Sequence, residues 1–185
     1  MSRSNFLECG RRSVLPRSIL FGLAGLLLAA ACWAEIPADE CTNPALTPTT
    51  PSSDFVPLGD GSEVLHLTTG LIWRRCGIGQ TWNGETCQGS LAGRNWQRAL
   101  EAAENAGEGW RVPNIKELLT LVERCRHDPA INREVFPATR AASYWSSSPY
   151  VAMDGWALQV GFEDGRQSFH GKGANLHVRL VRGRQ

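Results

Sequence analysis

The chain has 185 residues, of which 42% are apolar and 20% are charged, and its formal net charge is +1. This length allows one ordinary domain with a tail, and the composition excludes a disordered charged tail, a collagen repeat and a protein with many membrane spans. The near-neutral charge also argues against a generic nucleic-acid binder, which needs an excess of basic residues. The six cysteines are unusual in a chain of this size and raise the question of the redox compartment.

The first 34 residues have the pattern of an export signal. Four arginines and one glutamate precede an apolar run over 19–32, and small residues then lead to Ala34. A basic start, a short apolar core and a small residue at the exit are typical of a cleaved secretory signal. The apolar run is shorter than the roughly 18–20 residues that span a bilayer, so we expect no transmembrane segment after signal removal.

The signal leaves the route and the final compartment open. Residues 29–32 resemble a lipoprotein cleavage box, which would place a lipid on Cys32, and residues 11–15 resemble a loose twin-arginine signal. The general export route fits better with disulfide formation after export. We therefore expect an exported protein that is periplasmic, outer-membrane-associated or secreted.

Removal of residues 1–34 changes both the charge and the cysteine count. Basic residues fall from 19 to 15 and acidic residues from 18 to 17, so the mature charge is −2. Cys9 and Cys32 leave with the signal. An even number of cysteines remains in a chain that passes into an oxidising compartment, which is the pattern of a disulfide framework.

The mature chain begins with an arm over 35–57 that is rich in proline and threonine. Its prolines favour an extended backbone and cannot join a central strand. The domain proper is expected over 58–185. Within it, two short strands are predicted at 64–67 and 71–73, joined by a threonine–glycine turn.

Two helices follow, and each has a recognisable start. Asn95 is a candidate N-cap for a helix whose apolar residues recur at i, i+3, i+4 and i+7. Asn114 and Glu117 form a capping-box pattern at the start of the second helix. The apolar stripe of this helix predicts that Cys125 points inward on the same helical face as Val122.

From residue 143 onward the periodicity changes to two, which is typical of strands. One strand is predicted over 156–162, a hairpin turn at 163–165 leads into a second strand at 167–170, and a last strand covers 175–180. Two helices followed by a run of short strands predict an α+β domain of about 125 residues.

The four mature cysteines allow three disulfide pairings. Cys76 and Cys87 flank a short loop that contains glycine, so we expect them to pair, and we expect Cys125 to pair with Cys41 and fix the arm to the domain. A metal site and a redox pair are the alternatives. No C-x-x-C occurs and the thiols lack zinc-ligand spacing, so we favour structural disulfides and expect no metal and no cofactor.

Several segments occur in an order that is similar to a known family. They are 69–73 followed by Cys76, 79–84 followed by Cys87, 110–118, Asn132 with Phe136-Pro137, 144–148 and the closing 178–182. In this order they resemble the Lcl C-terminal domain family, a bacterial domain of unknown function that takes its name from a collagen-like adhesin. The resemblance spans about residues 54–182.

This resemblance implies a C-type-lectin-like fold, in which two helices pack on short antiparallel strands and long loops carry any site. In the named adhesin, the domain is implicated in binding sulfated glycosaminoglycans and in trimer formation. The present chain has no collagen-like repeat before the domain. Its mature charge of −2 and its two lysines, Lys116 and Lys172, argue against a strong polyanion site.

The candidate ligand-binding surface is basic. His177 and Arg179 share one face of the predicted last strand, and Arg166, His170 and Lys172 lie on the preceding hairpin and loop. Such a patch suits carboxylate or sulfate groups, and an ordinary solvated sheet face explains the same pattern.

Trp82 adds an aromatic candidate, because it lies in the loop bounded by the first cysteine pair. It is the tryptophan that we expect to be exposed for stacking on a sugar or a protein partner. Catalytic residues are not expected: the serines at 146–148 lack a nucleophile elbow and a placed base, and we expect Ser146 and Ser148 to bond backbone groups instead.

The sequence therefore predicts an exported, non-catalytic recognition module of the bacterial cell envelope that binds a glycan or a protein surface. The alternative is a structural subunit of an envelope or surface assembly with no small ligand. Neither hypothesis involves nucleic acid or a cofactor, and the sequence leaves the oligomeric state open.

Overall fold

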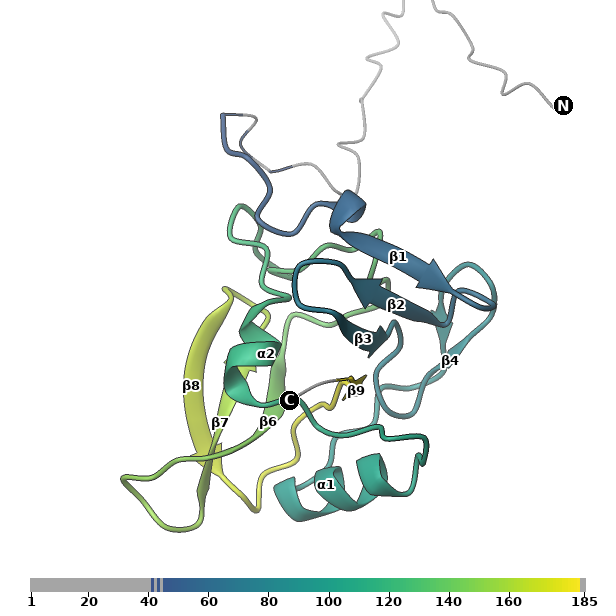
Figure 1. Cartoon of the computed structure of the whole chain (residues 1–185). Coiled ribbons are helices and arrows are strands. Elements are labelled where there is room, and N and C mark those ends of the chain that lie inside the picture. Colours follow the sequence, from purple (N-terminus) through teal and green to yellow (C-terminus); the bar gives the residue numbers. More distant parts are fainter. Residues whose placement is uncertain (1–40, 42, 44, 184–185) are drawn as a thin grey trace, which may run out of the picture. The chain divides into compact units, whose positions relative to one another are not determined.

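The computed structural model describes residues 41, 43 and 45–183. The expected signal over 1–34 and the part of the arm before residue 41 lie outside the described residues. The described chain forms two helices and three antiparallel sheets and carries two disulfides, which confirms the predicted mixed α+β fold (Figure 1).

The first sheet joins strands from both ends of the described chain. In the order β1-β2-β3-β9, its antiparallel strands are β1 (Phe55–Leu58), which follows a 3-10 turn at Ser52–Asp54, β2 (Glu63–His66), β3 (Leu71–Arg74) and β9 (Val181–Arg182). Both strands predicted in this region are confirmed. Alternation along β3 buries Leu71 and Trp73. Pro57 lies on the edge strand, where a missing N–H costs no central ladder bond.

A small ribbon of two strands, β4 (Thr81–Trp82) and β5 (Cys87–Gln88), follows the first sheet. The Asn83 side chain accepts hydrogen bonds from the backbone N–H groups of Glu85 and Thr86, and these bonds shape the turn between the strands. The Cys76–Cys87 disulfide closes this segment, and it joins the two cysteines that the sequence paired.

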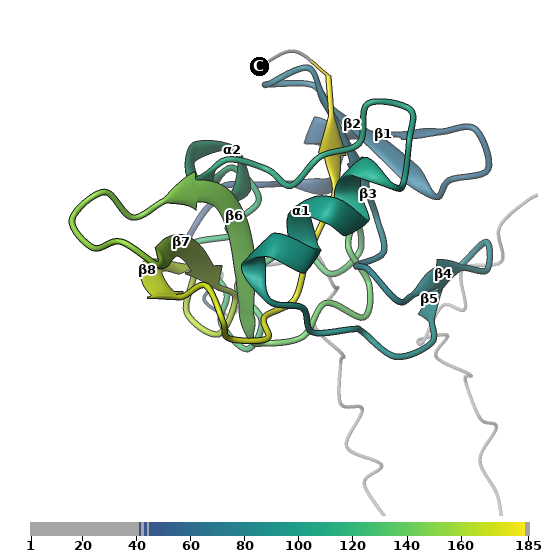
Figure 2. The ribbon, with the colours of Figure 1, turned by 90° about the horizontal axis from the view of Figure 1, so that it is seen from below.

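The first helix begins as predicted. α1 spans Trp96–Glu104, and the Asn95 side chain accepts a hydrogen bond of 2.9 Å from the backbone N–H of Arg98. Ala99 and Ala103 are buried on its inner face, and the helix lies beside β6 (Ser143–Pro149), as Figure 2 shows. Small buried residues let the helix approach the sheet closely.

The second helix is shorter than its apolar stripe predicts. α2 spans Ile115–Leu119, and both hydrogen bonds of the Asn114–Glu117 capping box are present. The prediction that Cys125 and Val122 share a helical face is wrong, because both lie beyond the end of the helix. Backbone pairing competes with further helix there: Val122 forms a bridge with Ile131, and the N–H of Glu123 donates to the carbonyl of Ala130.

The second sheet has the order β6-β7-β8, with β7 over Trp156–Gly161 and β8 over Arg166–Gly171. The predicted hairpin is confirmed. Gly165 in its turn has φ of +74°, and an added Cβ there would lie 2.4 Å from Val122. Backbone conformation and close packing therefore both require glycine at this position.

The last predicted strand is wrong over most of its length. Residues 175–180 exchange backbone hydrogen bonds with several separate segments, including a bridge from Leu176 to Arg94 and one from His177 to Tyr144. Regular pairing with β3 begins only at Val181. No single described strand pairs with this segment along its length. Its alternating side chains therefore do not divide into one buried face and one solvent-exposed face.

Two buried clusters make up the core. One lies among the first sheet, α2 and the second sheet, and its largest fully buried members are Trp73, Leu118, Leu121, Phe136, Tyr144 and Phe162. The other lies under α1 and contains Ala99, Ala103, Trp110, Trp145, Ala157 and Val178. The segment 176–181 contributes to both clusters, which explains why it is buried between them.

The arm is fixed to the domain by a disulfide and a buried carboxylate. Cys41 pairs with Cys125, which is the second pair that the sequence favoured. Next to this disulfide, Glu123 is 1% exposed and accepts hydrogen bonds from Thr49 and Thr50 of the arm. The arm residues next to β1 are therefore ordered parts of the domain.

Candidate functional site

Trp82 is half-buried rather than free for stacking on both faces. The guanidinium of Arg75 lies 4.1 Å from the centroid of its ring, and its indole N–H donates to the carbonyl of Asp60 at 3.2 Å. Trp82 nevertheless forms part of the wall of an open groove.

Three residues of the predicted basic patch stay together around β8. Arg166 and His170 are exposed on the strand, and Lys172 follows it. The His170 ring stacks on Trp156 with a centroid separation of 6.3 Å, and the Lys172 Nζ lies 4.4 Å from the centroid of Trp96. Arg166 and His170 are therefore accessible to a partner, and Lys172 is half-buried.

The other two residues of the patch are not on that surface. Arg179 is 1% exposed: its Nη1 donates to the carbonyls of Arg74 and Arg75 at 3.0 and 2.8 Å, and its Nη2 donates to the Thr139 hydroxyl at 2.7 Å. Burial lowers the pKa of Arg179 to about 10, so the side chain is still a cation at neutral pH. Its assignment to a ligand-binding face is therefore corrected to a structural role.

His177 is half-buried and packs against Tyr144 at a centroid distance of 5.4 Å. Burial lowers the pKa of His177, and the nearby positive charge of Arg140 lowers it further. The prediction placed His177 beside Arg179 on an open face, and the irregular path of 175–180 removes that face.

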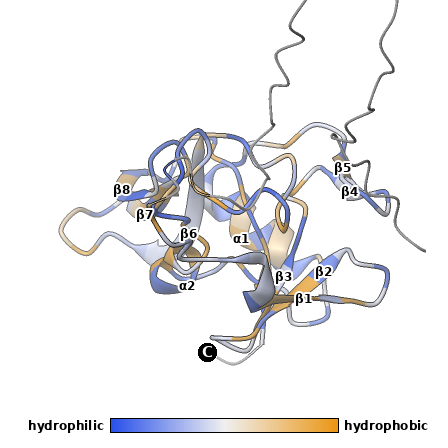
Figure 3. Cartoon of the chain, turned by 90° about the horizontal axis from the view of Figure 1, so that it is seen from above, coloured by the Kyte–Doolittle hydropathy of each residue, from blue (hydrophilic) through white to orange (hydrophobic). Residues whose placement is uncertain are grey.

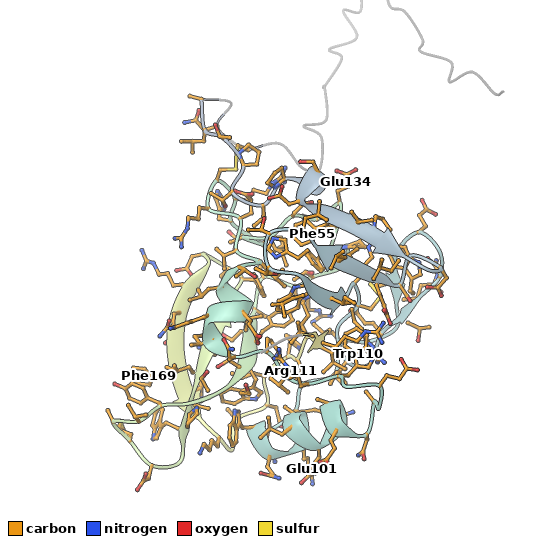
Figure 4. All side chains as sticks on the ribbon, in the orientation of Figure 1. Phe55, Glu101, Trp110, Arg111, Glu134 and Phe169 are labelled. Carbon is orange, nitrogen blue, oxygen red and sulfur yellow. A yellow bond between two sulfur atoms is a disulfide. The ribbon has the colours of Figure 1, made fainter. Side chains whose placement is uncertain are left out.

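A groove of about 700 Å³ lies between α1 and the loop that follows β3. Figure 4 labels Glu101 on α1, one of its lining residues. The helix contributes Arg98 and Glu101, its C-cap contributes Asn105, and the disulfide loop contributes Gly77, Gln80 and Trp82. A concave site lined by a few polar side chains and an aromatic ring is typical of ligand-binding sites.

Three arginines give the groove its chemical character: Arg74 at the end of β3, Arg94 before α1, and Arg98 on the helix. Among the described residues, none of them forms an ion pair with a carboxylate. The Nε of Arg94 is buried and lacks a hydrogen-bond partner within the same part of the chain. These guanidinium groups therefore have unused capacity to donate hydrogen bonds.

One of the two acidic residues that line the groove forms an ion pair. Glu63 accepts an ion-paired hydrogen bond of 2.6 Å from Arg182, and Glu101 accepts one of 3.1 Å from the side-chain amide of Gln97. Arg74 and Arg182 both lie over Trp110, with guanidinium carbons 4.7 and 4.8 Å from its ring centroids. Within the described residues, three arginines without an ion pair therefore outnumber the one unpaired carboxylate, that of Glu101, and the balance of charge in the groove is positive.

Guanidinium groups bind carboxylate, sulfate and phosphate through paired N–H donors, so the groove is suited to acidic groups. Two serine hydroxyls, which would be the candidates for nucleophilic catalysis, are hydrogen-bonded to the backbone. The Ser146 hydroxyl donates to the carbonyl of Leu158 at 2.8 Å, and the Ser148 hydroxyl accepts from the backbone N–H of Ile115 at 3.1 Å, as the sequence predicted for both serines.

Sequence reasoning missed the three groove arginines. Arg98 gave a weak signal, because it lies on the polar face of a well-marked helix. Arg74 and Arg94 gave none, since one ends a strand and the other lies in a loop, and only the folded chain brings them beside the helix. A shared site assembled from three separate segments leaves no local sequence pattern.

The fold and the groove define a disulfide-bridged α+β domain with a polar, cationic groove, and the two disulfides are consistent with an oxidising, extracytoplasmic location. The Lcl C-terminal domain family matches residues 62–182, so the chain belongs to this family. No curated protein matches its sequence. Within the described residues, none of the helices has the length and apolar character needed to cross a bilayer.

Proposed function

We propose that this chain is an exported, non-catalytic recognition module of the bacterial cell envelope, which binds acidic groups of a glycan or protein surface in the groove beside α1. The observation that carries the proposal is the set of three groove arginines without a carboxylate partner among the described residues, Arg74, Arg94 and Arg98. The two disulfides support export.

The mature charge of −2 does not conflict with an anion site, because affinity depends on the charges near the ligand. At physiological ionic strength, charges more than about 8 Å away are largely screened when they are exposed to solvent. Arg74 is also held over Trp110, which limits the conformational entropy that it loses when a ligand binds.

Binding of the exported chain to a panel of acidic and neutral oligosaccharides, and to proteins of an envelope extract, tests this proposal. Arg98→Glu reverses one charge in the groove, and Arg133→Glu makes the same change at an exposed position outside it. We expect Arg98→Glu to weaken binding by at least about tenfold and Arg133→Glu to change it by no more than about twofold. Equal effects of the two variants would remove the groove from the proposal.

The alternative of a structural subunit without a small ligand has one supporting observation. Val151 is 94% exposed and Met153 is 45% exposed on the loop between β6 and β7, and such side chains are typical of protein contacts. A partner that co-purifies stably, combined with no saturable binding of any acidic ligand, would favour this alternative.

A further inference from the structure

β8 is the outer edge of the second sheet. It pairs with β7 on one side only (Figure 1), and the side chains from Arg166 to His170 are all exposed. Edge strands of natural proteins are commonly shortened, bulged or covered, because their open backbone groups attract other strands. This six-residue strand pairs without a register shift along its whole length, and no described segment covers it.

The hydrogen bonds of β7 show which backbone groups of β8 are open. The carbonyl of Trp156 accepts from Tyr150 on the β6 side, whereas the carbonyl of Gly155 accepts from Lys172 on the β8 side. Because successive residues of a strand direct their backbone groups to opposite sides, Ala157 pairs toward β8 through His170. The backbone N–H and C=O groups of Gln167 and Phe169, at the alternate positions, therefore point away from the sheet.

An apolar surface lies beside this edge. Phe169, which Figure 4 labels, is 41% exposed. It stacks on Tyr150 with ring centroids 4.3 Å apart and planes at 4°. Trp156 meets the same phenylalanine edge to face. The adjoining loop carries the exposed Val151 and Met153, and it is coloured as hydrophobic in Figure 3. Apolar side chains of an added strand would find contacts on this face.

The other face of the edge is basic. Arg166, Ser168 and His170 alternate along β8 with Gln167 and Phe169, so their side chains lie on the opposite face of the strand, and Lys172 follows. The sequence from 166 to 183 contains no aspartate or glutamate. Arg166 forms an exposed ion pair of 3.3 Å with Asp164 in the preceding turn. An added strand with acidic side chains on this face would complement the charge.

We propose that the outer edge of β8 binds an extended segment of a partner protein in which acidic and apolar side chains alternate. The open groups of Gln167 and Phe169 supply main-chain hydrogen bonds, as in other cases of strand addition. Phe169 and Tyr150 select apolar side chains on one face, while Arg166 and His170 select acidic ones on the other.

Two features separate this site from other possibilities. None of the β8 residues lines the groove beside α1, so the inference does not depend on the proposed function. A second copy of this chain is a poor partner, because pairing two β8 strands would bring both sets of Arg166, His170 and Lys172 together.

A synthetic peptide of about eight residues that alternates glutamate and valine, with blocked ends, tests the proposal on the exported chain. We expect saturable binding, and we expect the same peptide with lysine in place of glutamate to bind at least about tenfold more weakly. Hydrogen exchange provides the direct reading: the amides of Gln167 and Phe169 exchange freely in the unbound protein and become protected when the peptide binds.

Gln167→Pro removes one outward N–H without removing a bond to β7, and Gln167→Ala is its matched control. We expect the proline variant to bind the glutamate peptide about tenfold more weakly and the alanine variant to bind as the parent does. Equal binding by both variants, or no protection of the Gln167 and Phe169 amides, would overturn the proposal. Protection of Gln167 and Phe169 that rises with protein concentration in the absence of peptide would also overturn it, in favour of a second copy.

Discussion

The carboxylate of Glu123 accepts two hydrogen bonds from Thr50, one from the backbone N–H at 2.7 Å and one from the hydroxyl at 3.0 Å. Its other oxygen accepts from the backbone N–H and hydroxyl of Thr49 and from the N–H of Cys125. A single buried carboxylate thus joins the arm to the segment that carries its disulfide. These hydrogen bonds and the Cys41–Cys125 disulfide therefore hold the arm on the same segment of the domain.

We predict that Glu123→Gln lowers the free energy of unfolding by about 2–4 kcal/mol, because the amide group of glutamine faces donors that need an acceptor. Urea denaturation of the oxidised protein measures the change. Glu104→Gln is the matched control: its side chain is exposed on α1, and we expect an effect within about 0.5 kcal/mol. Equal midpoints for the two variants would contradict the prediction.

The same carboxylate makes the stability of the arm depend on pH. Burial by itself raises the pKa of Glu123, but the donors of Thr49, Cys125 and Thr50 outweigh burial and hold the pKa below its usual value. A lowered folded-state pKa contributes stability that is complete above the unfolded-state value of about 4.3 and is lost as the pH falls through the folded-state value.

We therefore predict that the difference in unfolding free energy between the parent and Glu123→Gln is largest near neutral pH and shrinks as the pH falls below about 4. Denaturation curves of both proteins recorded at a series of pH values measure this difference. A difference that is independent of pH would show that the charge of Glu123 does not contribute.

Arg179 provides a second structural prediction. Arg179→Met leaves the carbonyls of Arg74 and Arg75 without their buried donor, and we expect a loss of about 2–4 kcal/mol in unfolding free energy. Arg166→Met, which removes the same group from an exposed position, is expected to cost less than about 0.5 kcal/mol. If both variants were equally stable, Arg179 would not be a structural residue.

Local patterns allowed much of the fold to be predicted. The caps at Asn95 and Asn114 and the hairpin at 163–165 were predictable because their geometry is set by residues within a few positions. Both cysteine pairs were predictable because an even number of cysteines in an oxidising compartment forms disulfides. The end of α2 did not follow from its apolar stripe. The apolar spacing that includes Val122 fits either a longer helix or a buried strand residue. The backbone bridge of Val122 with Ile131 decides in favour of the second.

The candidate site was predicted less well, and the reason is the path of the chain at 175–180. Alternation indicates a buried and an exposed face only when a strand lies in a sheet with one covered side. Arg179 instead meets carbonyls from residues more than a hundred positions earlier. The groove arginines Arg74, Arg94 and Arg98 follow no alternation or spacing in the sequence that would identify them as members of one site.

We expect removal of one disulfide to affect mainly stability and removal of the other to affect mainly ligand binding. Cys41→Ser/Cys125→Ser opens the longer loop, and chain-entropy estimates give a loss of about 4–5 kcal/mol, against about 3 kcal/mol for Cys76→Ser/Cys87→Ser. The shorter loop, however, forms one wall of the groove.

We therefore predict that the variant without the Cys76–Cys87 bridge, although the more stable of the two, loses more affinity for the acidic ligand proposed for the groove. Its freed loop must be ordered again when the ligand binds, and that cost in conformational entropy lowers the affinity. Binding is measured at a temperature where both variants are folded, as shown by their circular dichroism. A larger loss in the Cys41→Ser/Cys125→Ser variant would mean that the arm, rather than the disulfide loop, shapes the ligand site.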